Sequence, residues 1–213
     1  MATIHGEDGK ASSRPEEEEV KKSPRTKKGE FVPRADDAIL ATFPKCGTTW
    51  LKALAFSITN RSRHMLAHHP LLTRHPQDTV PFLELPNRQI QPLAYGWKLN
   101  NAKVLFLGYE EMMSDLVKEV KRLAEILGAP FTNTEERDAA IDEVVRLCSF
   151  EHFTGLEVNS TGVADRIGGF PMENSTCFRR GKVGDWVNHL NPEMAQQLDS
   201  IVKEKLKGSG LTF

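Results

Sequence analysis

Apolar residues recur along this chain of 213 residues at two spacings, one typical of strands and one typical of helices. Two short, nearly continuous apolar runs, Ala38–Thr42 and Lys103–Leu107, predict buried strands. Helical spacing begins at Thr48, and the apolar residues after it predict a helix that ends near Asn60. The region 61–92 carries five prolines and is therefore predicted to be mostly loop, with a short turn or two.

Three further helices are predicted downstream. Ser114 is expected to cap the first, which Gly128 and Pro130 end, and Thr134 to cap the second. Asn191 and Pro192 begin the last helix, and residues 154–177 are predicted to be loop. The apolar faces of these helices predict the core positions Leu116, Val117, Val120, Leu123, Ala124, Leu127, Ile141, Val144, Val145, Cys148, Met194, Leu198, Ile201 and Val202.

Strands that alternate with helices predict an α/β fold in which helices flank a parallel sheet. Two strands are few for such a sheet, because parallel strands need cover on both faces. Residues 1–30 are highly charged and nearly free of large apolar groups, so they cannot offset the entropy of ordering and are predicted to form a flexible tail. A docking segment is the alternative for the tail, and residues 31–213 are expected to form a single domain.

Composition narrows the class of protein. The formal net charge of −1 does not indicate a nucleic-acid binder, and no apolar run approaches the roughly 20 residues of a membrane span. The first residues lack the apolar stretch of a signal peptide. Three widely spaced cysteines, Cys46, Cys148 and Cys177, show neither a disulfide framework nor metal-ligand spacing, so a reducing, cytoplasmic location is expected.

The candidate chemistry begins with the turn between the first strand and the first helix, Phe43–Trp50. Free backbone N–H groups at a helix N-terminus favour an anion, Lys45 adds a positive charge, and Thr48 and Thr49 add hydroxyl donors. The pattern differs from the Walker A loop, since G-x-x-x-x-G-K-[ST] is absent. A phosphorylated ligand is therefore expected at this turn, and an ordinary strand–helix turn is the alternative.

The string Pro44–Trp50 (PKCGTTW) resembles the 5′-phosphosulfate loop of the cytosolic sulfotransferases, above all the plant members, which transfer a sulfuryl group from 3′-phosphoadenosine 5′-phosphosulfate (PAPS) to a hydroxyl or amine. Phe178–Trp186 (FRRGKVGDW) looks like the R-K-G-x-x-G-D-W loop of that family, which holds the 3′-phosphate. Val104–Met112 and Cys148–Phe153 are weaker matches, to a strand ending beside the adenosine and to an adenine-contacting turn. The resemblance thus implies a cofactor site made of Lys45, Cys46, Gly47, Thr48, Thr49, Trp50, Tyr109, Cys148, Ser149, Phe150, Arg179, Arg180 and Gly181.

The resemblance covers residues 31–213 but is interrupted, because roughly a hundred residues that the family has are missing between about 86 and 93. It therefore implies a truncated sulfotransferase fold. The catalytic histidine of the family, in a T-H-x-P setting, is absent, and no histidine occurs from Pro76 to Glu151. The C-R-x-P-x-D-x-x-x-S segment, which completes the 3′-phosphate site, is also missing. Val187 and Asn191-Pro192 replace key positions of a dimerisation stretch found in some animal members, so that dimer is not implied.

The leading hypothesis is a shortened PAPS-dependent sulfotransferase, in which Lys45 stabilises charge and the acceptor is a small phenol, flavonoid, steroid or similar hydroxyl compound. A non-catalytic nucleotide-binding remnant, or a chain that does not fold stably, is the second hypothesis. A small kinase is disfavoured, because the chain also lacks a clear acidic Mg²⁺ ligand. Four loop histidines are expected to be exposed or to contact the acceptor, with a relocated general base as the alternative; these are His64, His68, His69 and His75.

Overall fold

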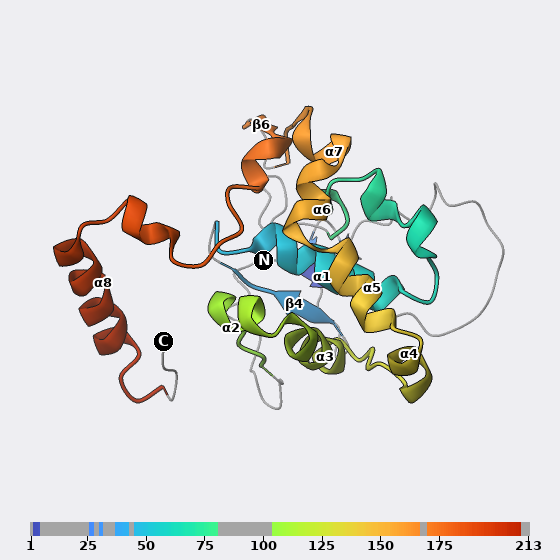
Figure 1. The fold of residues 1–213 in the computed structure, drawn as a ribbon, viewed down its shortest axis with the longest axis horizontal. Helices are drawn as coiled ribbons and strands as arrows, with labels where there is room; N and C mark the ends of the chain where they lie inside the picture. Colours follow the sequence, from blue (N-terminus) through green and yellow to red (C-terminus); the bar gives the residue numbers. More distant parts are fainter. Residues whose placement is uncertain are drawn as a thin grey trace.

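The computed structural model describes residues 37–42, 45–80, 104–166 and 170–209, together with the backbone of three short strands, β1 (Ala2–Ile4), β2 (Thr26–Lys27) and β3 (Glu30–Phe31). Helix α1 (Thr48–Asn60) lies at the centre, with α3 (Leu116–Ile126) and α5 (Ala140–Leu147) packed beside it (Figure 1). Burial of apolar surface between these three helices is the main stabilising contribution. Their core comprises Ala53, Leu54, Ile58, Val120, Leu123, Ala124, Ile141, Val144 and Leu147.

Shorter elements surround this core. Three 3₁₀ turns, η1 (Leu66–His68), η2 (Pro70–Leu72) and η3 (Pro76–Asp78), follow α1. The bounds of the remaining elements are α2 (Tyr109–Ser114), α4 (Asn133–Arg137), α6 (Phe150–Gly155), α7 (Glu157–Ser160), β5 (Val163–Ala164), β6 (Met172–Glu173), η5 (Asn174–Cys177), η6 (Asp185–Asn188) and α8 (Pro192–Lys205). Within the described part of the chain, no helix is both long and apolar enough to cross a membrane.

The first predicted strand is confirmed as β4 (Ala38–Leu40), but its partner is antiparallel. Thr3 of β1 lies opposite Ile39, and β2–β3 and β5–β6 are antiparallel pairs as well. The prediction of parallel pairing therefore does not hold among the described strands. The unpaired N–H and C=O groups at a strand edge can form hydrogen bonds with another extended segment, and here β1 from the N-terminal segment pairs with β4.

The second predicted strand, Lys103–Leu107, is wrong for its described part, since residues 104–108 belong to no strand. The side chains keep strand alternation: Leu105 and Leu107 pack against the core, and Val104 and Phe106 are exposed. Alternation reflects one buried face, whereas a strand also needs a ladder of hydrogen bonds to a neighbour. The local pattern is therefore present without the sheet that it predicts.

Two short described strands, β1 and β2, lie within residues 1–30, the segment predicted to be a flexible tail. The rest of that segment, and the junction near residues 86–93, lie outside the described residues. The prediction that 61–92 is mostly loop is confirmed as far as Val80, since η1 to η3 are single 3₁₀ turns.

The helix boundaries show which local signals decided the fold. The bounds of α1 and the Asn191 cap of α8 are as predicted, and Asn191 Oδ1 accepts from Met194 N at 2.9 Å. Asp115, rather than Ser114, caps α3, because its carboxylate accepts the N–H of Lys118.

The second predicted helix is divided into α4 and α5, and Thr132 rather than Thr134 forms the cap, in a capping box with Glu135. Ala139, at φ +60°, separates the two helices. The predicted loop 154–177 instead contains short elements from the end of α6 to η5.

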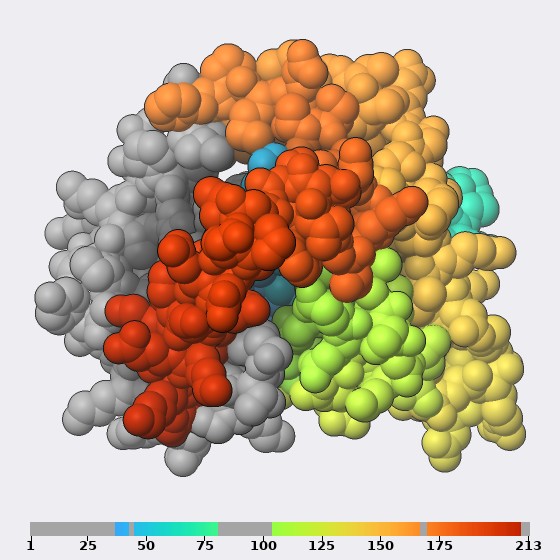
Figure 2. Space-filling view, turned by 60° about the vertical axis from the view of Figure 1, so that its left-hand side comes forward, coloured from blue at the N-terminus to red at the C-terminus, as the bar shows by residue number. Residues whose placement is uncertain are grey.

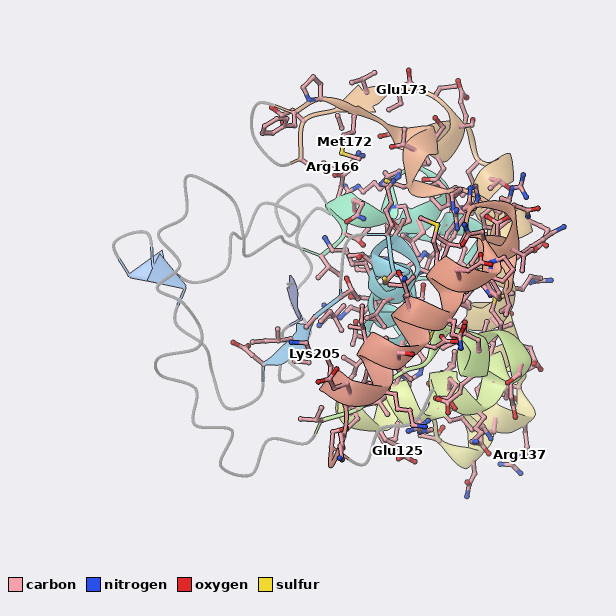
Figure 3. The ribbon with its side chains drawn as sticks, turned by 90° about the vertical axis from the view of Figure 1, so that its left-hand side faces the viewer. Glu125, Arg137, Arg166, Met172, Glu173 and Lys205 are labelled. Atoms are coloured by element: carbon pink, nitrogen blue, oxygen red, sulfur yellow. The ribbon has the colours of Figure 1, made fainter. Side chains whose placement is uncertain are left out.

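The burial predicted for α8 is wrong. Met194, Leu198, Ile201 and Val202 are each between two-fifths and just over half exposed, and α8 has no buried residue. The helix stands apart from the helical body, joined to it through η6 (Figure 1), and runs across the face seen in Figure 3. Helical spacing therefore gave the right apolar stripe, but the described residues provide no surface that buries it.

Candidate nucleotide site

The turn before α1 has the geometry of an anion cradle. Lys45 and Gly47 adopt left-handed backbone conformations, at φ +68° and +84°, and the helix starts without a side-chain cap. The first intrahelical bond is donated by Leu51 N to Gly47 O at 2.9 Å. The N–H groups of residues 48–50 have no acceptor among the described residues, and the helix dipole adds partial positive charge there. The turn can therefore bind an anionic group.

Lys45 reaches from this turn to the C-terminal part of the chain. Its Nζ donates to the backbone carbonyl of Thr176 at 2.7 Å, although 131 positions separate the two residues. Thr176 lies in η5, three residues before Arg179. Both sequence-predicted basic turns are thus brought to one side of the molecule, and in Figure 2 blue parts of the N-terminal region are visible behind the red and orange C-terminal segment.

The second basic turn is organised by a buried carboxylate. Asp185 accepts from Arg180 Nη1 at 2.7 Å, and Arg179 Nη1 lies 3.1 Å from its other oxygen. His189 Nε2 is 3.2 Å from the same carboxylate, and a hydrogen bond from Asn188, followed by contributions from His189 and the two guanidinium groups, lowers the pKa of Asp185. The two arginines remain largely exposed, so Asp185 holds them in place and leaves other N–H donors available to a phosphate.

Gly181 brings this turn against the predicted adenine-contacting segment. A Cβ at Gly181 would lie 2.5 Å from the ring of Phe150, and its φ is +61°. Only glycine fits there, since side chains rarely adopt that backbone region and the ring occupies the space. Ser149 caps α6 by accepting from His152 N at 3.2 Å. Contact between Gly181 and Phe150 therefore unites two separately predicted parts of the site.

Trp50 and Tyr109 form the aromatic part of the candidate site. Their ring centroids are 6.0 Å apart in an edge-to-face arrangement, and Trp50 Nε1 is buried without a hydrogen-bond partner among the described residues. Burial and the nearby Glu110 raise the pKa of Tyr109, whereas Arg179 lowers it.

The two cysteines among the candidate site residues differ in burial. Cys148 is fully buried, its Sγ lies 3.4 Å from Ser57 Oγ, and burial raises the pKa of its thiol to about 12. Its side chain therefore belongs to the core and does not face a ligand. Cys46 is exposed at the tip of the first turn.

A layer of polar side chains lies behind the first turn, and the sequence analysis did not predict it. Gln77 Nε2 donates to Thr49 Oγ1 at 2.7 Å, and Thr42 and Thr48 share a short hydroxyl–hydroxyl bond. Lys52 is fully buried and donates to Val80 O at 2.9 Å. Burial lowers the pKa of Lys52 to about 7. A lysine inside an otherwise apolar helical stripe was the one signal in the sequence that could have revealed this layer.

Two of the four loop histidines, which were expected to be exposed or to contact the acceptor, are buried. His69 and His75 are buried, and the Nδ1 of each accepts the backbone N–H two residues later. Burial is the largest cause that lowers both pKa values to about 4. Because Nδ1 is already an acceptor, the remaining nitrogen of each neutral ring carries the proton. Neither ring is therefore placed to act as a relocated general base, and His68 is exposed as predicted.

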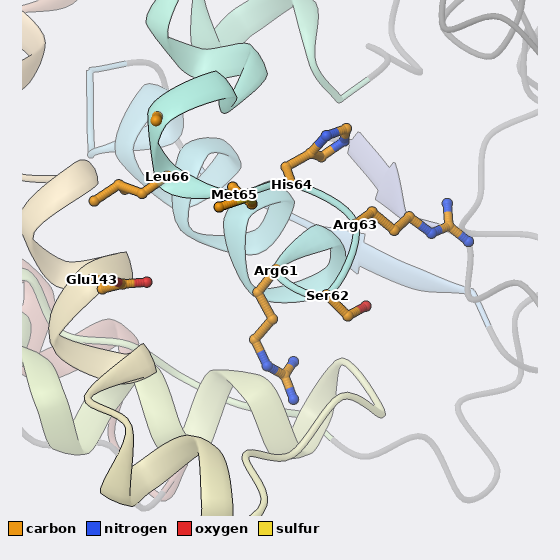
Figure 4. A pocket seen from close by; sticks show the side chains of 8 residues that line it. Arg61, Ser62, Arg63, His64, Met65, Leu66 and Glu143 are labelled. Carbon is orange, nitrogen blue, oxygen red and sulfur yellow. The ribbon is translucent and has the colours of Figure 1, made fainter.

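A surface hollow of about 610 Å³ lies at the opposite end of α1 from the basic turns. Figure 4 shows its lining by the segment 61–67 and Glu143. Helix α1 has 13 residues and so spans about 20 Å. This hollow is consequently separate from the candidate nucleotide site.

The family model described as "Sulfotransferase domain" matches this chain in two segments, residues 35–101 and 91–210. The chain belongs to the sulfotransferase family. It is 32% identical to cytosolic sulfotransferase 6 of Arabidopsis thaliana, over 86% of this chain and 82% of that protein. It is 30% identical to flavonol 4′-sulfotransferase of Flaveria chlorifolia, over 86% and 83% respectively. These alignments, over 273 and 267 positions, are longer than the chain itself.

Two solved structures are partly similar to this sulfotransferase. Mouse sulfotransferase SULT7A1, crystallised with PAP, is 29% identical, with a TM-score of 0.40 over 52% of this chain and 37% of the mouse chain. Retinol dehydratase in complex with androsterone and the inactive cofactor PAP is 27% identical, with a TM-score of 0.39 over 55% and 32%. The α/β class expected from the sequence agrees with the family, which the sequence matches establish.

Proposed function

We propose that this protein binds PAPS across its two basic turns and transfers the sulfuryl group to a hydroxyl of a small acceptor. The observation that carries the proposal is the bond from Lys45 to Thr176, which joins the first turn to the segment that leads into the second. The contact of Gly181 with Phe150 joins the second turn to the predicted adenine-contacting segment. Membership of the sulfotransferase family supports PAPS as the nucleotide. The flavonol named for one relative supports small hydroxylated acceptors as the substrate class.

The residues present fit the nucleotide. The first turn of α1 has no side-chain cap, and its N–H groups at 48–50 have no acceptor among the described residues, which suits the 5′-phosphate end. Arg179 and Arg180, held by Asp185, suit the 3′-phosphate. Trp50, Tyr109 and Phe150 supply aromatic surface between these ends. The residues beside these groups complete the proposed nucleotide site; they are Cys46, Gly47, Thr48, Thr49, Ser149 and Gly181.

Lys45 is the residue proposed for charge stabilisation. When the sulfuryl group moves to the acceptor oxygen, the bond between sulfur and the bridging oxygen breaks, and negative charge develops on that oxygen. An ammonium group in place before the reaction lowers the energy of this charge. Lys45 can turn from the Thr176 carbonyl towards the ligand, because the bond lies at the exposed surface.

A nucleotide-binding protein without turnover is the second candidate, and a specific observation favours it. The acceptor must lose a proton during transfer, and positioned general bases typically contribute about 10²–10⁴-fold. No histidine occurs from Pro76 to Glu151, and the acceptor nitrogens of His69 and His75 are occupied. The proposal includes an internal deletion near residues 86–93, which explains both the missing base and the two-segment family match.

The experiment combines binding and turnover. Calorimetry with adenosine 3′,5′-bisphosphate tests the nucleotide site, and radiolabelled PAPS with phenols, flavonoids and hydroxysteroids tests transfer. Transfer that Lys45→Ala abolishes supports the enzyme, and binding without transfer supports the second candidate. A cooperatively melting preparation that does not bind the bisphosphate at millimolar concentration contradicts both.

The proposal also includes a cytosolic location and a single folded domain. The relatives named cytosolic sulfotransferases support a cytosolic location. A single domain over residues 31–213 is supported by the one core that α1, α3 and α5 share.

A further inference from the structure

The turn η3 presses a glutamine side chain against the first turn of α1. Gln77 Nε2 donates to Thr49 Oγ1 at 2.7 Å, and Thr49 is the second residue of the helix. A hydroxyl has one proton and two acceptor sites. Because Thr49 accepts from Gln77, its own hydroxyl proton can be donated to another acceptor.

The backbone of Gln77 contacts two neighbouring side chains, and the residue after it is held by an ion pair. Its N–H donates to His75 Nδ1 at 3.1 Å, and the Nζ of Lys52, bonded to Val80 O at 2.9 Å, lies 3.5 Å from its carbonyl oxygen. The next residue, Asp78, forms a bidentate ion pair with Arg166, at 2.7 and 3.0 Å. Figure 3 labels Arg166 near the β5–β6 end of the molecule. Gln77 is thus fixed in place before any ligand binds.

We infer that Gln77 is a positioning residue for the 5′-phosphate end of the bound nucleotide and acts through the hydroxyl of Thr49. The inference rests on the proposed nucleotide site and adds a residue that lies outside both basic turns. Gln77 Oε1 is buried with no hydrogen-bond partner among the described residues, so the bond to Thr49 is the side-chain hydrogen bond that orients this amide there. Loss of one such bond corresponds to about a 3- to 10-fold change in affinity.

The test measures the affinity of the full chain for two nucleotides by calorimetry. Adenosine 3′,5′-bisphosphate carries the 5′-phosphate, and adenosine 3′-monophosphate lacks it. Gln77→Met, which keeps the length of the side chain and removes its donor, is expected to weaken bisphosphate binding about 3- to 10-fold and to leave monophosphate binding unchanged. Thr49→Val should give a similar loss, and the double variant should lose no more than Thr49→Val alone. Gln197→Met, at an exposed position of α8, is the matched control.

Each other outcome overturns the inference. Equal weakening of both nucleotides would indicate a merely structural role, and additive losses would show that Gln77 does not act through Thr49. If Gln77→Met does not melt cooperatively, Gln77→Glu replaces it, since an acceptor-only carboxylate must take the Thr49 proton and should again weaken the bisphosphate selectively. Wild-type protein that does not bind the bisphosphate would refute the proposed function together with this inference, whereas normal wild-type binding with unaffected variants would refute the inference alone.

Discussion

Lys45 and Thr176 are joined by a hydrogen bond of 2.7 Å from the lysine Nζ to the backbone carbonyl oxygen. The bond connects the turn that starts α1 to the segment that leads into Arg179 and Arg180. It is exposed, so it contributes little to the free energy of unfolding, but it holds the ammonium group between the two proposed phosphate subsites.

Replacement of Lys45 should therefore affect binding and leave folding nearly unchanged. For Lys45→Ala we expect an affinity for adenosine 3′,5′-bisphosphate at least 10-fold lower, because a charged hydrogen bond contributes about 1.5–3 kcal/mol. The urea midpoint should stay close to the wild-type value. Calorimetry and urea titration measure the two effects, and Lys203→Ala, at an exposed lysine of α8, is the control.

Gly181→Ala should disrupt the contact between the second turn and Phe150. The new methyl group would lie 2.5 Å from the ring at a backbone φ of +61°, so we expect a destabilisation of about 1–3 kcal/mol and weaker nucleotide binding. Gly184→Ala separates the clash with Phe150 from the strain of a positive φ, since φ is +80° there and no atom lies within 4 Å of the added Cβ. Equal losses of stability and affinity in the two variants would contradict a specific role for the Phe150 contact.

Lys52 should make stability rise with pH above neutrality. Its pKa is about 7 in the folded protein and near 10.5 when unfolded, so the unfolded state binds more protons between these values. The free energy of unfolding therefore increases from pH 7 to about pH 10.5. Urea titrations of wild type and Lys52→Met over this range should diverge in favour of wild type as pH rises. A constant difference across the range would show that Lys52 is charged in the folded state.

Glu135 should contribute stability that acid removes. Its pKa is lowered from 4.5 to about 2, first by the hydrogen bond from Arg61, with a 2.7 Å contact between Arg61 Nε and Glu135 Oε1. This contribution is complete above the ordinary glutamate pKa and is lost as pH falls towards 2. Glu135→Gln should therefore unfold at lower urea than wild type at pH 7, and the gap should close by pH 2. Glu136→Gln, in the exposed pair with Lys121, should show a smaller gap.

The sequence by itself determined the elements that depend on neighbouring residues. The bounds of α1 follow from apolar spacing after Gly47, and the start of α8 follows from Asn191 and Pro192. The two basic, glycine-containing turns are also local patterns, so their residues could be named in advance. The match to the sulfotransferase domain then agreed with the family that these two turns resemble.

Only the tertiary structure decided what depends on contacts between distant segments. Strand pairing requires a neighbour, so Ala38–Leu40 pairs with residues 2–4 and the alternating run 104–107 forms no strand. Burial requires an opposing surface, so the apolar stripe of α8 stays exposed and Lys52 and His75 are enclosed. The bonds from Gln77 to Thr49 and from Lys45 to Thr176 join residues 28 and 131 positions apart. No periodicity along the chain encodes such distances, because they arise only when the helices pack around their common core.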